Sequence, residues 1–147
     1  MPPRVDFYVL ASADDRALRV YACRVIEKAF LQKLTVCVNL GTPAEAAAFD
    51  LLLWTFADRS FEPHALAAAG GAAAGAPPET PVQVGCRIEV AADLLVNLAP
   101  EVPEFHGGYP RVADFVDAEA ARREAGRRRF AFYRERGCAP ETHKVAG

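Results

Sequence analysis

Hydrophobic residues form two kinds of pattern in the first part of the chain. Residues 5–10 and 34–40 are short, continuous apolar runs rich in β-branched and aromatic side chains, so each run predicts a buried strand. Between them, apolar residues recur at helical spacing, at Leu18, Ala22, Val25, Ile26 and Ala29. The pattern therefore predicts a strand, a helix and a second strand.

Polar residues mark where the helices of this region begin. Asp14 is placed to cap the first helix. After the second strand, Thr42, Pro43 and Glu45 have the order of an N-cap, a first helical residue and the reciprocal partner of a capping box. Continuous apolar strands that alternate with helices predict a mostly parallel sheet in an α/β fold, with helices on its faces.

The later pattern predicts more strands and one last helix. Residues 82–90 and 94–100 are strand candidates, and residues 110–116 predict one more strand or an approach segment. From Asp117 to about residue 136 the spacing is helical, and Gly137 stands where a glycine commonly ends a helix.

Two segments lack a periodic pattern. Residues 67–81 are rich in alanine, glycine and proline, which predicts a flexible surface loop. Residues 138–147 are expected to form a C-terminal tail. Because no repeat and no linker divides the chain, we expect a single domain over residues 1–147.

Composition narrows the class of protein. Hydrophobic residues make up 52% and charged residues 24% of the 147, which is typical of a globular protein. The net charge of −2 argues against a general nucleic-acid binder, which is usually basic. The charge is uneven, with a net of +3 from Asp117 onward and −5 before it. The basic end could therefore attract an acidic partner.

Location follows from what the sequence lacks. The start of the chain has no secretory h-region or cleavage site, and no apolar run approaches the roughly 20 residues that span a bilayer. The cysteines are too far apart for a zinc knuckle or a C-x-x-C pair, at Cys23, Cys37, Cys86 and Cys138. We expect reduced thiols and a cytoplasmic protein without membrane contact.

No motif for catalysis, a cofactor or a metal appears. The turns after the first two strands, ASADD and GTPAE, match neither glycine-rich phosphate motif, so we expect an α/β sheet without a phosphate-binding loop. No G-x-S-x-G elbow is present. His64, His106 and His143 lack metal-ligand spacing. We therefore expect no catalytic residue, no cofactor and no metal.

The last helix contains an unusual basic and aromatic stretch, RRRFAFYRERG, from residue 127 to residue 137. Arg127, Phe130 and Arg134 are spaced to share one face, and Tyr133 follows Phe130 at i+3. Phe132 lies about 200° from Phe130 and is expected to point into the core. Three interpretations remain open: a nucleic-acid grip, a socket for an acidic protein partner, or an ordinary helix with a solvated basic face.

Several stretches in fixed order resemble the chi subunit family of the bacterial DNA polymerase III holoenzyme. They are VDFYVL, LLLWTFADRSFEPHALAAAG, PVQVG, LLVNL, VADFVDAE and RRFAFYRERG, and together they cover nearly the whole chain. The most specific pattern runs from Trp54 through SFEPHAL at residues 60–66. The resemblance implies a Rossmann-like three-layer α/β/α fold.

The family resemblance also implies a role and two partners. Chi proteins are accessory subunits without catalysis of their own, within a nucleotidyltransferase complex. They form a heterodimer with psi, which joins them to the clamp loader, and a helicase can compete for that surface. They also bind the acidic, phenylalanine-ended C-terminal tail of single-stranded-DNA-binding protein, so their contact with nucleic acid is indirect.

Where the motifs of this sequence match those of the family, the resemblance assigns the two binding roles to particular residues. Tail binding falls on Val116 as a pocket floor and on Arg127, Phe130 and Tyr133. A lysine that family members can have after the first aromatic is Ala131 here, and Arg128 or Arg134 could compensate. Psi binding falls on Trp54, Phe61, Pro63 and His64, although a tryptophan beside a loop is also a common half-buried core residue.

Two other functions stay open at this point. The last helix could bind single-stranded nucleic acid directly, through phosphate pairing and base stacking. Alternatively, a small-molecule enzyme could use the sheet, although the missing phosphate motif argues against that function.

Overall fold

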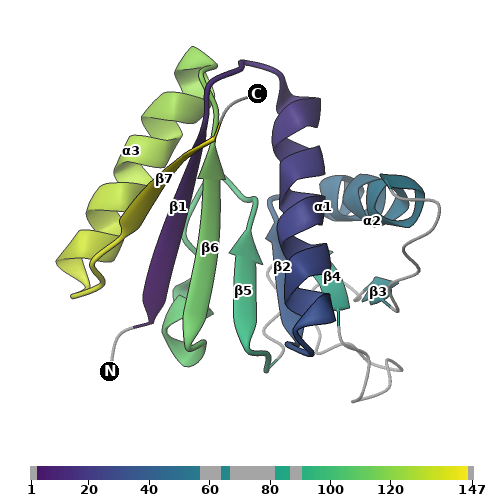
Figure 1. Ribbon diagram of the computed structural model, residues 1–147. Helices are drawn as coiled ribbons and strands as arrows, with labels where there is room; N and C mark the ends of the chain where they lie inside the picture. Colours follow the sequence, from purple (N-terminus) through teal and green to yellow (C-terminus); the bar gives the residue numbers. More distant parts are fainter. Residues whose placement is uncertain (1–2, 57–63, 67–81, 87–90, 146–147) are drawn as a thin grey trace.

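The computed structural model describes residues 3–56, 64–66, 82–86 and 91–145, which form one seven-stranded sheet with helices on both faces (Figure 1). The strand order is β3-β4-β2-β5-β6-β1-β7, and every pairing between described strands is parallel. The predicted three-layer α/β/α fold with a mostly parallel sheet is therefore confirmed.

The described elements follow the predicted order with three additions. They are β1 (Arg4–Leu10), α1 (Asp15–Leu31), β2 (Val36–Leu40), α2 (Pro43–Phe56), β3 (His64–Leu66), β4 (Val82–Cys86), β5 (Leu94–Asn97), the 3-10 helix η1 (Glu104–Gly108), β6 (Arg111–Val116), α3 (Ala120–Glu135) and β7 (Glu141–Val145). The predicted loop at 67–81 lies outside the described residues.

The direction of the chain decides which face each helix covers. From β1 to β2 and from β2 to β3 the chain moves one way across the sheet, whereas from β6 to β7 it moves the opposite way. Because crossovers between parallel strands are right-handed, α1 and α2 share one face and α3 takes the other. The hydrophobic core is accordingly split into two clusters, one under α1 and α2 and one under α3.

The predicted helix ends are present. The Asp14 carboxylate accepts a hydrogen bond of 3.0 Å from the Arg16 N–H at the start of α1. At α2, the Thr42 hydroxyl accepts one of 3.1 Å from the Glu45 N–H and lies 3.3 Å from the Glu45 carboxylate. After α3, Gly137 has a φ of 82°, a conformation that favours glycine.

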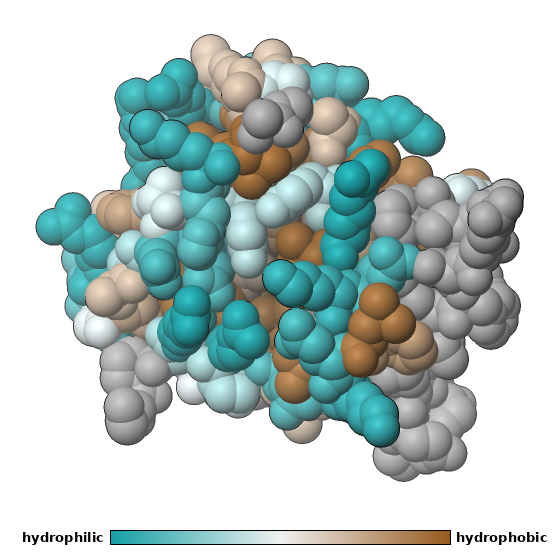
Figure 2. Space-filling model, in the orientation of Figure 1, coloured by the Kyte–Doolittle hydropathy of each residue, from teal (hydrophilic) through white to brown (hydrophobic). Residues whose placement is uncertain are grey.

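The last residues differ from the prediction of a tail. Residues Glu141–Val145 form β7, which pairs with β1 as an edge strand. Its side chains are mostly exposed and polar, so this strand has no apolar run to mark it in the sequence. The face seen in Figure 2 is likewise mostly hydrophilic, with a few separate hydrophobic patches.

Candidate functional site

The three consecutive arginines of α3 lie in different environments. The side chains of Arg127 and Arg128 are 70% and 77% exposed, whereas that of Arg129 is 7% exposed. Successive helix residues are about 100° apart, so three consecutive side chains point to different faces of the helix. Arg127 and Arg128 are thus exposed to solvent and open to a partner, whereas Arg129 belongs to the interior.

Arg129 fastens α3 to the sheet. Its Nε donates to the two carboxylate oxygens of Asp114 at 3.0 and 3.1 Å. Its terminal nitrogens donate to the carbonyls of Phe115 at 2.9 Å and Pro100 at 3.1 Å. Because Asp114 is completely buried, the pair is held where ion pairs are screened little by water. The guanidinium therefore fixes α3 against β6 and against the loop that follows β5.

Tyr133 belongs to the same buried network. Its hydroxyl donates to Asp114 Oδ2 at 2.8 Å, and the Asn97 amide donates to the same oxygen at 3.2 Å. Asn39 extends the network with a bond of 3.1 Å to Asn97 Oδ1. Burial, and then the negative charge of Asp114, raise the pKa of Tyr133 far above its ordinary range, so its hydroxyl remains a donor.

The aromatic residues of α3 are arranged differently from the sequence expectation. Phe132 is half-buried, edge-on to the His106 ring and beneath the Arg136 guanidinium at 4.5 Å from its centroid. Tyr133, expected on the binding face, is the aromatic that fills the core. In this structure Tyr133 therefore supports the helix from inside and has no exposed surface for a ligand.

An exposed stripe of α3 combines positive charge with an apolar edge. The members are Arg123, Arg127, Phe130 and Arg134, at i, i+4, i+7 and i+11. Phe130 is half-buried, with its ring edge-on to Phe7 at 5.5 Å, so part of it reaches the surface between the arginines. Arg123 was missing from the sequence hypothesis, although its helical spacing from Arg127 would have indicated it.

Val116 and Gly126 form the close contact beneath this stripe. Val116 ends β6 and is buried. A Cβ added at Gly126 would lie 2.7 Å from Val116 Cγ2, so only a glycine allows the helix this close. Val116 therefore lies under the backbone of α3, as a support rather than an open pocket floor.

The expected psi-binding residues are described only in part. Trp54 lies in α2 and His64 in β3, whereas Phe61 and Pro63 lie outside the described residues. The nearby surface of α2 is apolar, because Leu51 is 65% exposed and Ala47 and Ala48 are also exposed. The structure thus brings Val116, Phe130 and Tyr133 together at α3 and places Trp54 on a different helix.

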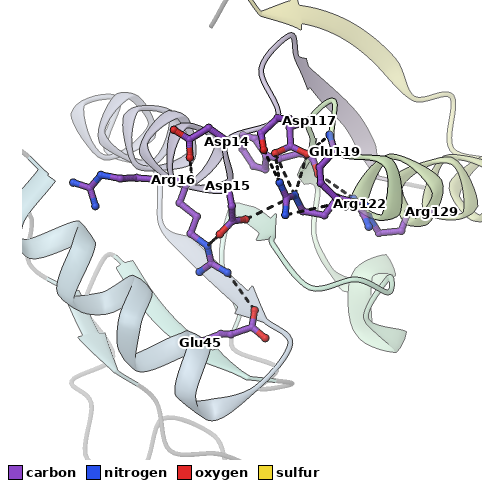
Figure 3. Close-up of polar contacts among 11 residues, drawn as sticks. Asp14, Asp15, Arg16, Glu45, Asp117, Glu119, Arg122 and Arg129 are labelled. Carbon is purple, nitrogen blue, oxygen red and sulfur yellow. Dashed lines mark hydrogen bonds and ion pairs between the residues drawn. The ribbon is translucent and has the colours of Figure 1, made fainter.

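Charged residues of three helices meet at the carboxyl edge of the sheet (Figure 3). Arg19 of α1 contacts Asp15 at 2.9 Å and Glu45 of α2 at 3.2 Å. Arg122 of α3 contacts Asp117 at 2.8 Å and lies 4.0 Å from Asp15. A cavity of about 400 Å³ lies here, with charged lining residues Asp15, Arg19, Glu45 and Arg122 and an apolar lining that includes Leu18, Leu98 and Phe115.

This edge is where parallel α/β proteins usually bind ligands, with phosphates at helix N-termini. Here the chain's own carboxylates occupy those N-termini. Asp14 caps α1, and Glu119 accepts from the Arg122 N–H at 2.7 Å at the start of α3. Hydrogen bonds from the N–H groups of Arg122 and Ala121 lower the pKa of Glu119, which keeps it ionised. The charged residues of this edge hold the helices together, and the N–H groups at the helix N-termini already have carboxylate partners in place of a bound anion.

Known proteins resemble this chain over nearly its whole length. Residues 1–141 match the family described as DNA polymerase III chi subunit, HolC. A protein of Pseudomonas aeruginosa named DNA polymerase III subunit chi is 39% identical over 144 residues, which cover 97% of this chain and 96% of that protein. A protein of the same name from Haemophilus influenzae is 28% identical, with 99% of each chain covered.

The chain belongs to the DNA polymerase III chi subunit family. The family match extends from β1 to the first residue of β7, so it includes both α2 and α3. This membership confirms the resemblance argued from the Trp54 segment and the last helix. Within the described part of this chi-family chain, no helix is long and apolar enough to cross a bilayer.

Proposed function

We propose that this chi-family chain is a replication accessory subunit that binds two protein partners. Psi joins it to the clamp loader, and the acidic C-terminal tail of single-stranded-DNA-binding protein binds α3. The chain itself has no catalytic role, and its contact with DNA is indirect. The observation that carries this proposal is the exposed stripe of α3, where Arg127 and its neighbours flank the half-buried Phe130.

The chemistry of the tail fits this stripe. A terminal phenylalanine needs an apolar surface, and the edge of Phe130 against Phe7 offers one. The terminal carboxylate and the preceding aspartates need cations, and the guanidinium groups of Arg123, Arg127 and Arg134 can pair with them. Arg127 lies 3.8 Å from Glu124, an exposed and weak pair that an incoming carboxylate can replace.

Buried contacts keep this surface in place. Arg129 and Tyr133 hold the inner face of α3 on Asp114, so the outer face does not have to be ordered when the tail binds. Val116 and Tyr133 thus act on the tail through the position of the helix. Arg128 and Arg134 supply the charge that Ala131 does not.

Calorimetric titration of the whole protein with the last ten or so residues of the tail tests the proposal. A matched peptide that lacks the terminal phenylalanine is the control ligand. Arg127→Ala should weaken binding by roughly 1.5–3 kcal/mol, the range for hydrogen bonds to charged groups. Arg24→Ala, an exposed arginine on α1, should leave it unchanged. Equal loss from both variants, or no binding at all, would contradict a tail site on α3.

The psi surface is proposed around Trp54, with Phe61, Pro63 and His64 beside it, and a helicase would compete for it. Support comes from the apolar outer surface of α2, where Leu51 is exposed. Trp54→Ala should abolish co-purification with psi while tail binding persists. Leu31→Ala removes a leucine of α1 that is 72% exposed, and it serves as the control. Normal co-purification of a folded Trp54→Ala protein would refute the assignment.

Direct binding of single-stranded DNA is a second candidate, because four arginines of α3 and its C-cap arginine are exposed: Arg123, Arg127, Arg128, Arg134 and Arg136. Phosphate contacts would make such binding fall steeply with salt. We expect bare oligonucleotide to bind much more weakly than the tail peptide at physiological salt. A cytoplasmic location, where thiols are kept reduced, completes the proposal.

A further inference from the structure

Three potential metal ligands lie side by side on the first and last strands of the sheet. In the parallel pairing of β1 with β7, Asp6 is opposite Glu141 and Tyr8 is opposite His143. Side chains two residues apart in a strand point to the same face, so the two β7 residues flank Asp6. His143 Nε2 is 2.9 Å from Asp6 Oδ1, and one donor atom from each residue lies within 4.8 Å of the others.

A cationic group already occupies this position. The Arg4 guanidinium lies 3.5 Å from Asp6 Oδ1 and 3.3 Å from Glu141 Oε2. Arg111 contacts the other oxygen of Asp6, Oδ2, at 3.6 Å. One Asp6 oxygen thus faces Arg4 and His143, and the second faces Arg111. The two carboxylates therefore bind a positive charge at the place where a metal ion would sit.

The donor set suits a particular ion. One imidazole nitrogen and two carboxylate oxygens are ligands that Zn²⁺ accepts, with water in the remaining position. His143 is held in orientation by its stacking on the Tyr8 ring, at 5.1 Å and 25°. We propose that Asp6, Glu141 and His143 form a Zn²⁺ site in which the ion replaces the Arg4 guanidinium.

The two arginines oppose metal binding, and their environments decide how strongly. The side chains of Arg4 and Glu141 are 59% and 60% exposed, so the ion pair between them contributes little and the arginine can swing into water. Arg111 contacts Asp6 at Oδ2 and leaves Oδ1 to the metal. The site is thus a competition between one exposed guanidinium and one divalent ion.

A metal bound here would fasten the last strand. All three ligands come from β1 and β7, and β7 follows α3 directly along the chain. Because β7 is an edge strand with a mostly exposed surface, a cross-link to buried Asp6 adds to its backbone pairing. This inference is independent of the proposed partners of α2 and α3.

Titration of the whole chain with ZnCl₂ in a non-chelating buffer, monitored by calorimetry, tests the site. Co²⁺ absorption provides a second readout, because it reports nitrogen and oxygen coordination directly. We expect saturation at one equivalent. His143→Ala should weaken binding at least about tenfold, the lower end of what even outer-shell changes cost metal sites. Arg4→Ala should tighten it, and Arg24→Ala should change nothing.

Arg4→Ala distinguishes this site from adventitious binding, because only an ion that competes with the Arg4 guanidinium should bind more tightly when that arginine is removed. Glu141→Gln keeps the size of an exposed side chain, so it tests the ligand set even if His143→Ala disturbs β7. The proposal is overturned if no saturable binding occurs, if the His143 and Glu141 variants bind as tightly as the parent, or if Arg4→Ala does not bind more tightly.

Discussion

Arg129→Ala should destabilise the protein far more than the same change at either neighbouring arginine. The substitution removes the partner of Asp114, which is completely buried. Breaking a buried ion pair on one side typically costs about 3–5 kcal/mol, because the remaining charge stays desolvated. The carbonyls of Phe115 and Pro100 also lose their donor. Since whole domains are stable by only about 5–15 kcal/mol, this one change removes a large fraction of the total.

Equilibrium unfolding in urea, followed by far-ultraviolet circular dichroism, measures the effect. Arg128→Ala is the matched control, because its side chain is 77% exposed and its loss should stay within about 0.5 kcal/mol. Adding Asp114→Asn to Arg129→Ala should recover part of the stability, because no uncompensated charge is then buried and the amide oxygen can still accept from Tyr133. A loss below about 1 kcal/mol for Arg129→Ala would show that the network does not hold α3.

Two further changes test the packing of α3. Because the pKa of Tyr133 is raised above its ordinary value of 10.0, the folded state holds this proton more tightly than the unfolded state. The contribution of Tyr133 to the free energy of unfolding should therefore be complete below pH 10 and be lost as the pH rises, and Tyr133→Phe should flatten that fall in urea titrations. Equal slopes for the two proteins would contradict a tyrosine that is buried and bonded to Asp114. Gly126→Ala should lower the thermal midpoint through its clash with Val116, despite the roughly 1 kcal/mol that alanine gains in a helix. Gly107→Ala, where nothing lies within 4 Å, should have little effect, and an unchanged midpoint for Gly126→Ala would refute the close contact.

Sequence reasoning succeeded where a pattern repeats along several residues. The apolar runs at β1 and β2 and the caps at Asp14 and Thr42 were all predicted, because strand burial and helix capping are local properties. β7 was missed for the opposite reason. It is a polar edge strand that forms only because β1 offers a free edge, and this tertiary cause leaves no local signal.

The orientation of α3 could have been predicted more closely. In a run of three arginines, charge alone does not tell which one faces the sheet. Gly126, Arg129 and Tyr133 are spaced at i, i+3 and i+7, and the glycine and the tyrosine at the ends indicate a close-packed, buried stripe. This spacing puts Arg129 on the helix face that packs against the sheet and Arg127 on the face exposed to solvent. The buried acceptor, Asp114, comes from a different strand, and only the folded structure brings it to the arginine.

The carboxyl edge of the sheet is a reason to propose partner binding on the helices instead. In many parallel α/β proteins this edge holds a nucleotide, but here Asp14 and Glu119 fill helix N-termini with the chain's own charge. Arg19 then links α1 to Glu45 of α2, and Arg122 links α3 to Asp117. These contacts favour one rigid body that presents the outer surfaces of α2 and α3. A ligand at one surface changes the affinity at the other only if some element has two conformations whose populations both ligands shift. These ion pairs hold the helices in one arrangement and do not provide such an element. We therefore expect the two proposed partners to bind independently, so the tail affinity of the chain alone and of its complex with psi should be equal.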